Sequence, residues 1–309
     1  MTGVNRIAMV AGIVVAGLLT FAPARDGSTM TSRFVSGSQA VVQGARRVAV
    51  GMTGVVAGLF NQGATPVYAQ DQDGSAQQAA DFVWHGSVRM GQILEIKGVN
   101  GDIIAERAPG EEIEVRAEKR ARQSDVNEVH IEVVEHADGV MLCAVYPSSR
   151  GRENTCEPGS GGRTNIRNND VRVTFYVSVP ENVAFTGSTV NGDVGVHDLG
   201  SDVDAKSVNG DIQISTTGLA EANTVNDATM ERYNIEAGLS FSTVNGSISL
   251  DLPDDVNADL DAAWVNGRLD ADLPFELIGR VSCRSAKGVL GDGGPELNLK
   301  TVNGSIHIF

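Results

Sequence analysis

A short motif, Val-Asn-Gly followed by a polar and then an aliphatic residue, recurs along this chain and constrains its fold more than any other feature. Intervals between copies from residue 190 onward are 18, 17, 19, 21, 21 and 16 residues. A period near 20 that persists over residues 190–302 is typical of stacked structural units. The copies begin at Val99, Val190, Val208, Val244, Val265 and Val302, with degenerate copies at Val225 ("TVNDAT") and Ala286 ("SAKGVL").

The residues around each copy alternate between apolar and polar. In the copy at Val208, Val203 and Ala205 precede the motif, and Ile212 and Ile214 follow it. This alternation predicts a strand with one buried face on each side of the motif. Counted from the motif valine, the apolar positions are odd before it and even after it, so the chain must bend at Asn-Gly.

Asn-Gly between apolar runs usually indicates a hairpin, and a meander of hairpins is the alternative fold. A meander would give successive motifs varied flanks, whereas here every copy has the same upstream and downstream pattern. We therefore predict that residues 183–309 form an all-β, parallel β-solenoid (β-helix) with coils of about 17–21 residues.

The corner residues are predicted to hold this solenoid together. We expect glycine to supply the positive φ of each corner, with Asp227 replacing it in the third copy. We expect the asparagines, stacked about 4.8 Å apart, to form a hydrogen-bonded ladder, a structural role favoured over a row that grips a ligand. The predicted corner residues are Asn100, Gly101, Asn191, Gly192, Asn209, Gly210, Asn226, Asn245, Gly246, Asn266, Gly267, Asn303 and Gly304.

Residues 85–182 are predicted to form an N-terminal cap that includes one early repeat, at Val99. Segments 112–119, 128–136, 139–147 and 170–180 alternate as half-exposed strands, and a loop rich in Gly, Arg and Asn spans 148–169. Solenoids need their open ends covered to stay soluble, so we expect these strands to pair antiparallel as a cap.

The first 69 residues resemble an export leader. Residues 7–22 are apolar, and a second segment has Arg46 and Arg47 before the apolar run 48–60 and a small-residue cleavage site ending at Ala69. We predict cleavage after Ala69, with Met30 a possible internal start and 70–84 a linker. The alternative is a pair of membrane spans, for which both runs are short. The chain is expected in the periplasm, on the cell surface or secreted.

Charge narrows the choice of partner. Five of the 24 basic residues and one of the 39 acidic residues precede residue 70, so the exported part carries 19 basic and 38 acidic residues, a net charge of −19. Nucleic acid is excluded as a partner because its phosphates need a basic stripe. Stable membrane insertion of the exported part is not expected either.

Three cysteines follow the predicted cleavage site. Cys143 and Cys156 flank a twelve-residue loop, and we predict a disulfide between them in an oxidising compartment. Such a bridge would stabilise the fold by about 3 kcal/mol. Cys283 is expected to be a buried free thiol.

Candidate chemistry is sparse. Asp193 and Asp211 occupy the same place in successive coils, where two carboxylates could suit glycoside hydrolysis or a calcium ion. Later coils have other residues there, and Asp after Asn-Gly is ordinary in turns, so we predict no catalytic residue, no metal site and no cofactor. Polysaccharide binding or cleavage by a β-helix is the alternative function.

The "VNGDI"-type corners, the segment "VRVTFYVSVPENV" and the leader together resemble the bacterial putative adhesin family, over roughly residues 85–309. These are exported β-strand-repeat proteins of unknown biochemical activity. The resemblance implies a non-catalytic β-helix of the cell envelope, an adhesin or structural module, whose partner is an envelope or extracellular protein or glycan.

Overall fold

The computed structural model describes residues 77–78, 82–148, 151–230, 237–273, 275–277 and 284–309. All of them belong to one unit of the chain, Ala45–Phe309. The predicted leader with Met30 and the cleavage site after Ala69, most of the 70–84 linker, and Cys283 lie outside the described residues. The all-β class is confirmed, because the described residues form two large mixed sheets and contain no α-helix.

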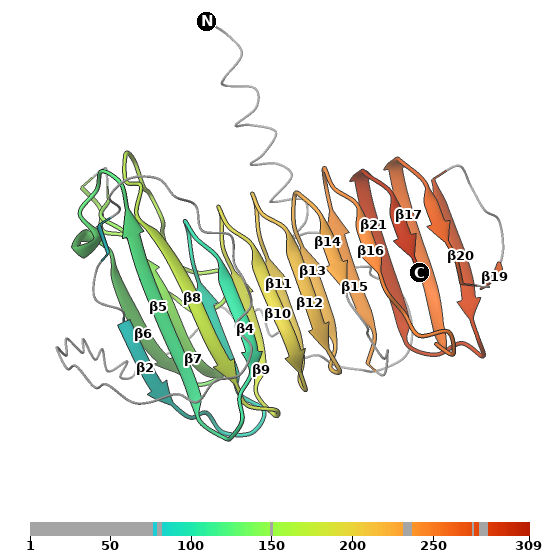
Figure 1. The fold of residues 1–309 in the computed structure, drawn as a ribbon, viewed down its shortest axis with the longest axis horizontal. Helices are drawn as coiled ribbons and strands as arrows, with labels where there is room; N and C mark the ends of the chain where they lie inside the picture. The colour runs from blue at the N-terminus through green and yellow to red at the C-terminus, as the bar shows by residue number, and fades with distance from the viewer. Residues whose placement is uncertain (1–76, 79–81, 149–150, 231–236, 274, 278–283) are drawn as a thin grey trace, which may run out of the picture. The chain divides into compact units, whose positions relative to one another are not determined.

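Sheet A has eleven strands in the order β1-β5-β8-β4-β10-β12-β14-β16-β22-β18, with β2 also paired to β5 (Figure 1). A 3-10 helix, η1, spans Val126–Glu128 before β6. The strands of sheet A are β1 Gln77–Gln78, β2 Phe82–Gly86, β4 Ile103–Arg107, β5 Ile113–Ala121, β8 Arg172–Val179, β10 Val194–Leu199, β12 Ile212–Thr216, β14 Ala228–Met230, β16 Ile248–Leu250, β18 Leu269–Ala271 and β22 Ile306–Ile308.

Sheet B also has eleven strands, in the order β19-β20-β17-β21-β15-β13-β11-β9-β3-β7-β6. Its strands are β3 Ile93–Lys97, β6 His130–His136, β7 Gly139–Val145, β9 Ala184–Ser188, β11 Val203–Lys206, β13 Ala220–Asn223, β15 Leu239–Thr243, β17 Ala258–Asn266, β19 Phe275–Leu277, β20 Ser285–Leu290 and β21 Glu296–Asn303.

Each repeat contributes one strand to each sheet. In the copy at Val208, β11 of sheet B leads into the motif and β12 of sheet A leaves it. Strands of neighbouring repeats pair in parallel and in register, for example Val203 with Ala220 and Val194 with Ile212. A hairpin meander would have paired them antiparallel, so that alternative is wrong for these repeats.

The inward-facing residues of both sheets share one core. Ile212 and Ile214 of sheet A and Val203 and Ala205 of sheet B belong to the same hydrophobic cluster, and each is at most 3 % exposed. The parity change at the motif therefore has a simple cause: the chain turns from one sheet to the other while keeping its apolar residues on the inside.

The early repeat lies within the stack. β3 pairs with β9 and β4 with β10, both in parallel, and an isolated bridge joins Asn100 to Asn191. Beyond this repeat, β5 pairs antiparallel with β8, and β6 pairs antiparallel with β7. The repeat at Val99 is thus the first rung of the stack, and the antiparallel strands lie outside it.

The last repeats depart from chain order. β21 lies between β15 and β17, and β22 lies between β16 and β18, so the copy at Val302 sits between those at Val244 and Val265 (Figure 1). The expectation of coils that climb strictly in sequence is wrong here. The interpretation of Ala286 as a seventh copy of the series is also wrong, because β20 runs antiparallel to β17. Its "SAKGVL" lacks the asparagine that joins other copies together.

Candidate functional site

The corner asparagines form two hydrogen-bonded runs along the stack, which we call the Asn ladder. In the first run, Asn191 Nδ2 donates to Asn100 Oδ1 at 2.8 Å and Asn209 Nδ2 donates to Asn191 Oδ1 at 2.9 Å. In the second run, Asn266 donates to Asn303 at 2.7 Å and Asn303 donates to Asn245 at 2.8 Å. These amide groups therefore bind each other across repeats.

The copy at Asn226 separates the two runs. Only Asp227 stands between Asn226 and the next strand, whereas two residues stand there in the neighbouring copy at Asn209. Because Ala228 pairs with Ile212, Asp227 is in register with Asp211 and not with Gly210. The prediction that Asp227 replaces the corner glycine is therefore wrong: this copy is one residue shorter.

The corner glycines allow close stacking. Of the six glycines, only Gly101 has a positive φ, of 125°. The predicted positive φ is wrong for the other five. A Cβ built on Gly210 would lie 1.9 Å from the carbonyl oxygen of Gly192, and a Cβ on Gly192 would lie 2.1 Å from that of Gly101. Equivalent collisions with neighbouring backbone occur at Gly246, Gly267 and Gly304. Glycine is required because each corner rests directly on the corner below.

The aspartates that follow the glycines form a second column, the Asp ladder. Asp102 Oδ1 accepts a hydrogen bond from the backbone N–H of Asp193 at 3.0 Å, and Asp193 Oδ1 accepts one from Asp211 at 2.9 Å. Asp211 accepts one from Asp227 at 3.3 Å, and Asp227 accepts one from Ser247 at 2.6 Å. Each carboxylate thus satisfies a backbone donor of the next repeat.

This arrangement corrects the interpretation of Asp193 and Asp211 as an isolated pair. The column extends to Asp102 on one side and to Asp227 on the other, so the expectation that it ends at Asp211 is wrong. The described residues contain no group of three or more His, Cys, Asp or Glu side chains that could hold a metal ion. The geometry of these carboxylates suits the stacking of corners, because each has an oxygen committed to the backbone.

A buried row of hydroxyls, directly before five of the motif valines, was missed by the sequence reasoning. Thr189 Oγ1 donates to the carbonyl oxygen of Gly101 at 3.0 Å, Ser207 Oγ to that of Gly192 at 2.8 Å, and Thr224 Oγ1 to that of Gly210 at 2.8 Å. Thr243 and Thr301 both donate to Gly246. All five side chains are buried. The signal was present in the sequence as Ser or Thr before every one of these valines.

A disulfide joins Cys143 on β7 to Cys156, with 6.1 Å between the Cα atoms. Together with Met141 and Val145, Cys143 forms a small hydrophobic cluster separate from the main core, against which Val134 and Cys156 pack. Because successive residues of a strand point to opposite faces, this cluster lies on the outer face of sheet B.

A lysine fastens the same loop to sheet B. Lys97 Nζ donates to the carbonyl oxygens of Glu157 and Gly159 and lies 3.4 Å from the carboxylate of Glu95. Glu95, only 6 % exposed, accepts a hydrogen bond from the backbone N–H of Gly159 at 3.0 Å. The buried carboxylate therefore has both a charged partner and a hydrogen-bond donor, as burial of a charge requires. The disulfide and the hydrogen bonds of Lys97 and Glu95 to the loop backbone hold the loop at two points.

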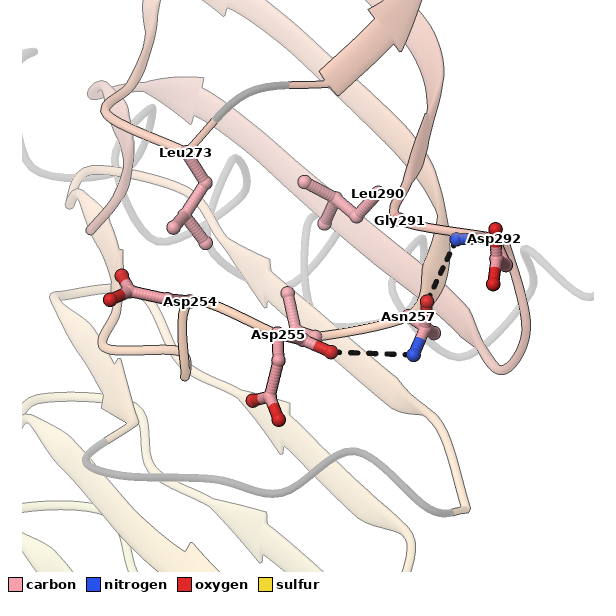
Figure 2. Close-up of a pocket in the computed structure, with 8 residues that line it drawn as sticks. Asp254, Asp255, Asn257, Leu273, Leu290, Gly291 and Asp292 are labelled. Carbon is pink, nitrogen blue, oxygen red and sulfur yellow. Dashed lines mark hydrogen bonds between the residues drawn. The ribbon is translucent and has the colours of Figure 1, made fainter.

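One cavity, of about 260 Å³, lies near β17 and β20 (Figure 2). Leu273 and Leu290 form its apolar part, while Asn257 accepts from the backbone N–H of Asp292 at 2.7 Å and donates to the carbonyl oxygen of Asp255 at 3.3 Å. Figure 2 shows the carboxylates of Asp254 and Asp255 pointing in different directions. These acidic groups do not converge on one point as the ligands of a metal ion would.

A larger cavity, of about 640 Å³, lies between β6 and the disulfide-bonded loop. It is lined by residues 128 and 130–133 at β6, and by residues 145–148 and 151–156 of the loop. We call this cavity the β6 groove. It has the volume of a typical ligand pocket and combines apolar with charged side chains.

The described residues include no helix with the length and hydropathy needed to cross a membrane.

Neither a family model nor a curated protein matches the chain. Several solved structures resemble it distantly. A "putative cell adhesion protein" from Clostridium sporogenes is 14 % identical, with a TM-score of 0.42, over 75 % of this chain and 99 % of that one. A "putative adhesin" from Bacteroides fragilis is 9 % identical, with a TM-score of 0.23, over 74 % and 97 %. A "putative lipid binding protein" from Parabacteroides distasonis is 12 % identical, with a TM-score of 0.22, over 74 % and 96 %. Similarity at this level assigns no activity to the chain.

Proposed function

We propose that this chain is an exported, non-catalytic β-solenoid of the cell envelope, an adhesin-like module that binds an envelope or extracellular protein or glycan. The observation that carries the proposal is that the repeated polar side chains form hydrogen bonds between repeats. Asn, Asp and Ser or Thr of the motif all bond to neighbouring repeats, as at Asn191, Asp193 and Ser207. The repetition therefore serves to build a long, regular support.

The solenoid itself is part of the proposal. Parallel, in-register pairing in both sheets and a core shared between them are what a coil that rises one step per repeat requires. In this proposal, the repeats within residues 183–309 and the early repeat form the coils, apart from the antiparallel pair β19 and β20, and the antiparallel strands within 85–182 form the N-terminal cap. Residues 1–69 form the leader, removed after Ala69.

The polysaccharide-cleaving alternative is disfavoured by the Asp ladder. Asp193 and Asp211 each hold a backbone N–H of the following repeat. A glycosidase needs two carboxylates free to exchange protons with the sugar or to attack it.

The test compares binding with turnover. Purified full-length chain should bind saturably to isolated bacterial envelopes, and acidic polysaccharides incubated with it should keep their chain length. Release of oligosaccharides that is lost in Asp193→Asn or Asp211→Asn would contradict the proposal. Intact mass of protein recovered from the periplasm or medium tests export, with Gln70 expected at the mature N-terminus.

A further inference from the structure

Each Asn-Gly corner contains the two groups that react when an asparagine deamidates. The backbone nitrogen of the glycine attacks Cγ of the asparagine side chain and a five-membered succinimide forms, while the Cγ–Nδ2 bond breaks and ammonia leaves with the proton of that nitrogen. Water then opens the ring at either carbonyl, which gives isoaspartate or aspartate. Glycine favours the attack because it has no Cβ to hinder it. The chain has six such steps, which begin at Asn100, Asn191, Asn209, Asn245, Asn266 and Asn303.

One of these steps is far more open to water than the others. Residues 265–268, and with them Gly267, are all exposed. The other five corner glycines are buried or only partly exposed, namely Gly101, Gly192, Gly210, Gly246 and Gly304. The cause is the order of the stack: each of those corners lies beneath another copy, whereas the copy at Val265 is the last, because β18 ends sheet A. The register of β20 with β17 ends at Ala263, before the corner is reached.

The reacting groups of this last step are also held by few hydrogen bonds. Asn266 Nδ2 donates to Asn303 Oδ1 at 2.7 Å. In the described part of the chain, neither Asn266 Oδ1 nor the N–H of Gly267 has a hydrogen-bond partner. The side chain of Asn266 can therefore turn its Cγ toward the glycine nitrogen once a single bond of the Asn ladder is released.

At the neighbouring corner both reacting groups are held. Asn303 Nδ2 donates to Asn245 Oδ1 at 2.8 Å, and Asn303 Oδ1 accepts from Asn266. The N–H of Gly304 donates to the carbonyl oxygen of Asn266 at 3.0 Å. Asn191 likewise has two bonds in the Asn ladder. Such a side chain must lose both bonds before it can approach the next backbone nitrogen, so the ladder protects its inner asparagines.

We propose that Asn266–Gly267 is a site of spontaneous covalent modification, at which Asn266 converts through the succinimide to isoaspartate and aspartate while the other five Asn-Gly steps persist. The product has a carboxylate in place of the amide, so it can no longer donate to Asn303. Isoaspartate also lengthens the backbone of the corner by one methylene group. Modification therefore releases the last corner from the copy beside it. The reaction needs only water, so this inference is independent of the proposed function.

Peptide mapping by mass spectrometry tests the proposal. The purified full-length chain is kept folded in mildly alkaline buffer, samples are digested with pepsin in acid to suppress further reaction, and electron-transfer fragmentation distinguishes isoaspartate from aspartate. Asn266 should convert at least about fivefold faster than Asn191, which has one more ladder bond to release. It should also convert faster than Asn209, whose side chain also has one ladder bond but whose glycine is buried.

The unfolded chain supplies the reference. In concentrated urea the six steps should convert at similar rates, because the contacts that distinguish them in the folded chain are lost. Asn266→Gln, whose longer side chain disfavours ring closure, should remove the mass gain at this site. Conversion of Asn266 no faster than that of Asn191 or Asn209 in the folded chain, the same preference for Asn266 in urea, or a mass gain that persists in Asn266→Gln would overturn the inference.

Discussion

The side-chain amide of Asn191 donates a hydrogen bond of 2.8 Å to the side-chain oxygen of Asn100, which lies 91 residues earlier in the chain. The bond connects the early repeat to the main series. The insert between the two repeats therefore does not interrupt the stack. Four kinds of contact repeat at this junction, and for three of them, the Asn ladder, the glycine stacking and the buried hydroxyls, a substitution gives a testable prediction.

An asparagine inside the Asn ladder should contribute more to the free energy of unfolding than an asparagine at its end. Asn191 makes two ladder bonds, to Asn100 and Asn209, whereas Asn266 makes one, to Asn303. Asn191→Ala should lower the free energy of unfolding by about 1–2 kcal/mol, and Asn266→Ala by about half as much, since each hydrogen bond contributes about 1 kcal/mol. Urea unfolding of both variants measures this. Equal effects would show that the ladder does not act through these bonds.

Alanine at a corner glycine should be severely destabilising. In Gly210→Ala the new Cβ would collide with the carbonyl oxygen of Gly192, and the corners would have to separate. We expect a loss of about 3 kcal/mol or more in unfolding free energy. Gly110 has open space around its Cβ position and no positive φ, so Gly110→Ala should be neutral or slightly stabilising. A fully stable Gly210→Ala protein would contradict the close stacking.

The buried hydroxyl row should be sensitive to loss of the hydroxyl alone. Thr224 Oγ1 donates to Gly210 and accepts from the backbone N–H of Asn226 at 3.1 Å. Thr224→Val keeps the shape of the side chain but leaves these backbone groups unsatisfied, which should cost about 1–3 kcal/mol. Thr217→Val, at an exposed position, is the control and should change thermal stability little. Similar melting temperatures for the two variants would contradict the prediction.

Asp170 should make the free energy of unfolding depend on pH in the acidic range. Hydrogen bonds from the Ser124 hydroxyl, and then from the backbone N–H groups of Ser124, Arg122 and Gln123, lower the pKa of Asp170 from 3.8 to about 2. A lowered pKa stabilises the fold above the unfolded-state value, and this contribution is lost as pH falls from about 4 through 2. The stability difference between wild type and Asp170→Asn should therefore shrink over that interval.

Asp138→Asn provides the matched control. Asp138 is exposed, and its carboxylate accepts no hydrogen bond recorded among the described residues. Chemical unfolding of wild type, Asp170→Asn and Asp138→Asn at the same pH values measures both differences. A difference for Asp170→Asn that stays constant from pH 5 to about pH 2 would exclude the proposed role of the carboxylate.

Periodicity and parity were sufficient to predict much of the fold. The change from odd to even apolar positions at Val208 follows from a chain that passes between two sheets with a common core. The identical flanks of the copies predicted that neighbouring repeats pair in parallel, as Val203 and Ala220 do. These features are local in sequence and repeat, so a single chain reveals them.

Other features depended on contacts that sequence spacing does not encode. The order of the last repeats could not be predicted from the sequence. The strands Ala258–Asn266 and Glu296–Asn303 have the same alternating apolar residues, so the pattern does not show which of them pairs with β15. The reason for glycine was misjudged because Asn-Gly suggests a turn conformation, whereas the cause at Gly210 is the backbone of another repeat. The β6 groove is formed by segments apart in sequence, and no motif marked it.

The position of β21 and β22 has a consequence for biosynthesis. Both follow β17 to β20 in the chain, yet they separate β15 and β16 from β17 and β18. During synthesis, strands β15 and β16 cannot gain their partners β21 and β22 until residues 296–308 have left the ribosome. The two sheets can therefore be completed only after β21 and β22 have been synthesised. Until then, the exposed edges of β15 and β16 are where a chaperone or an incorrect strand would bind the nascent chain.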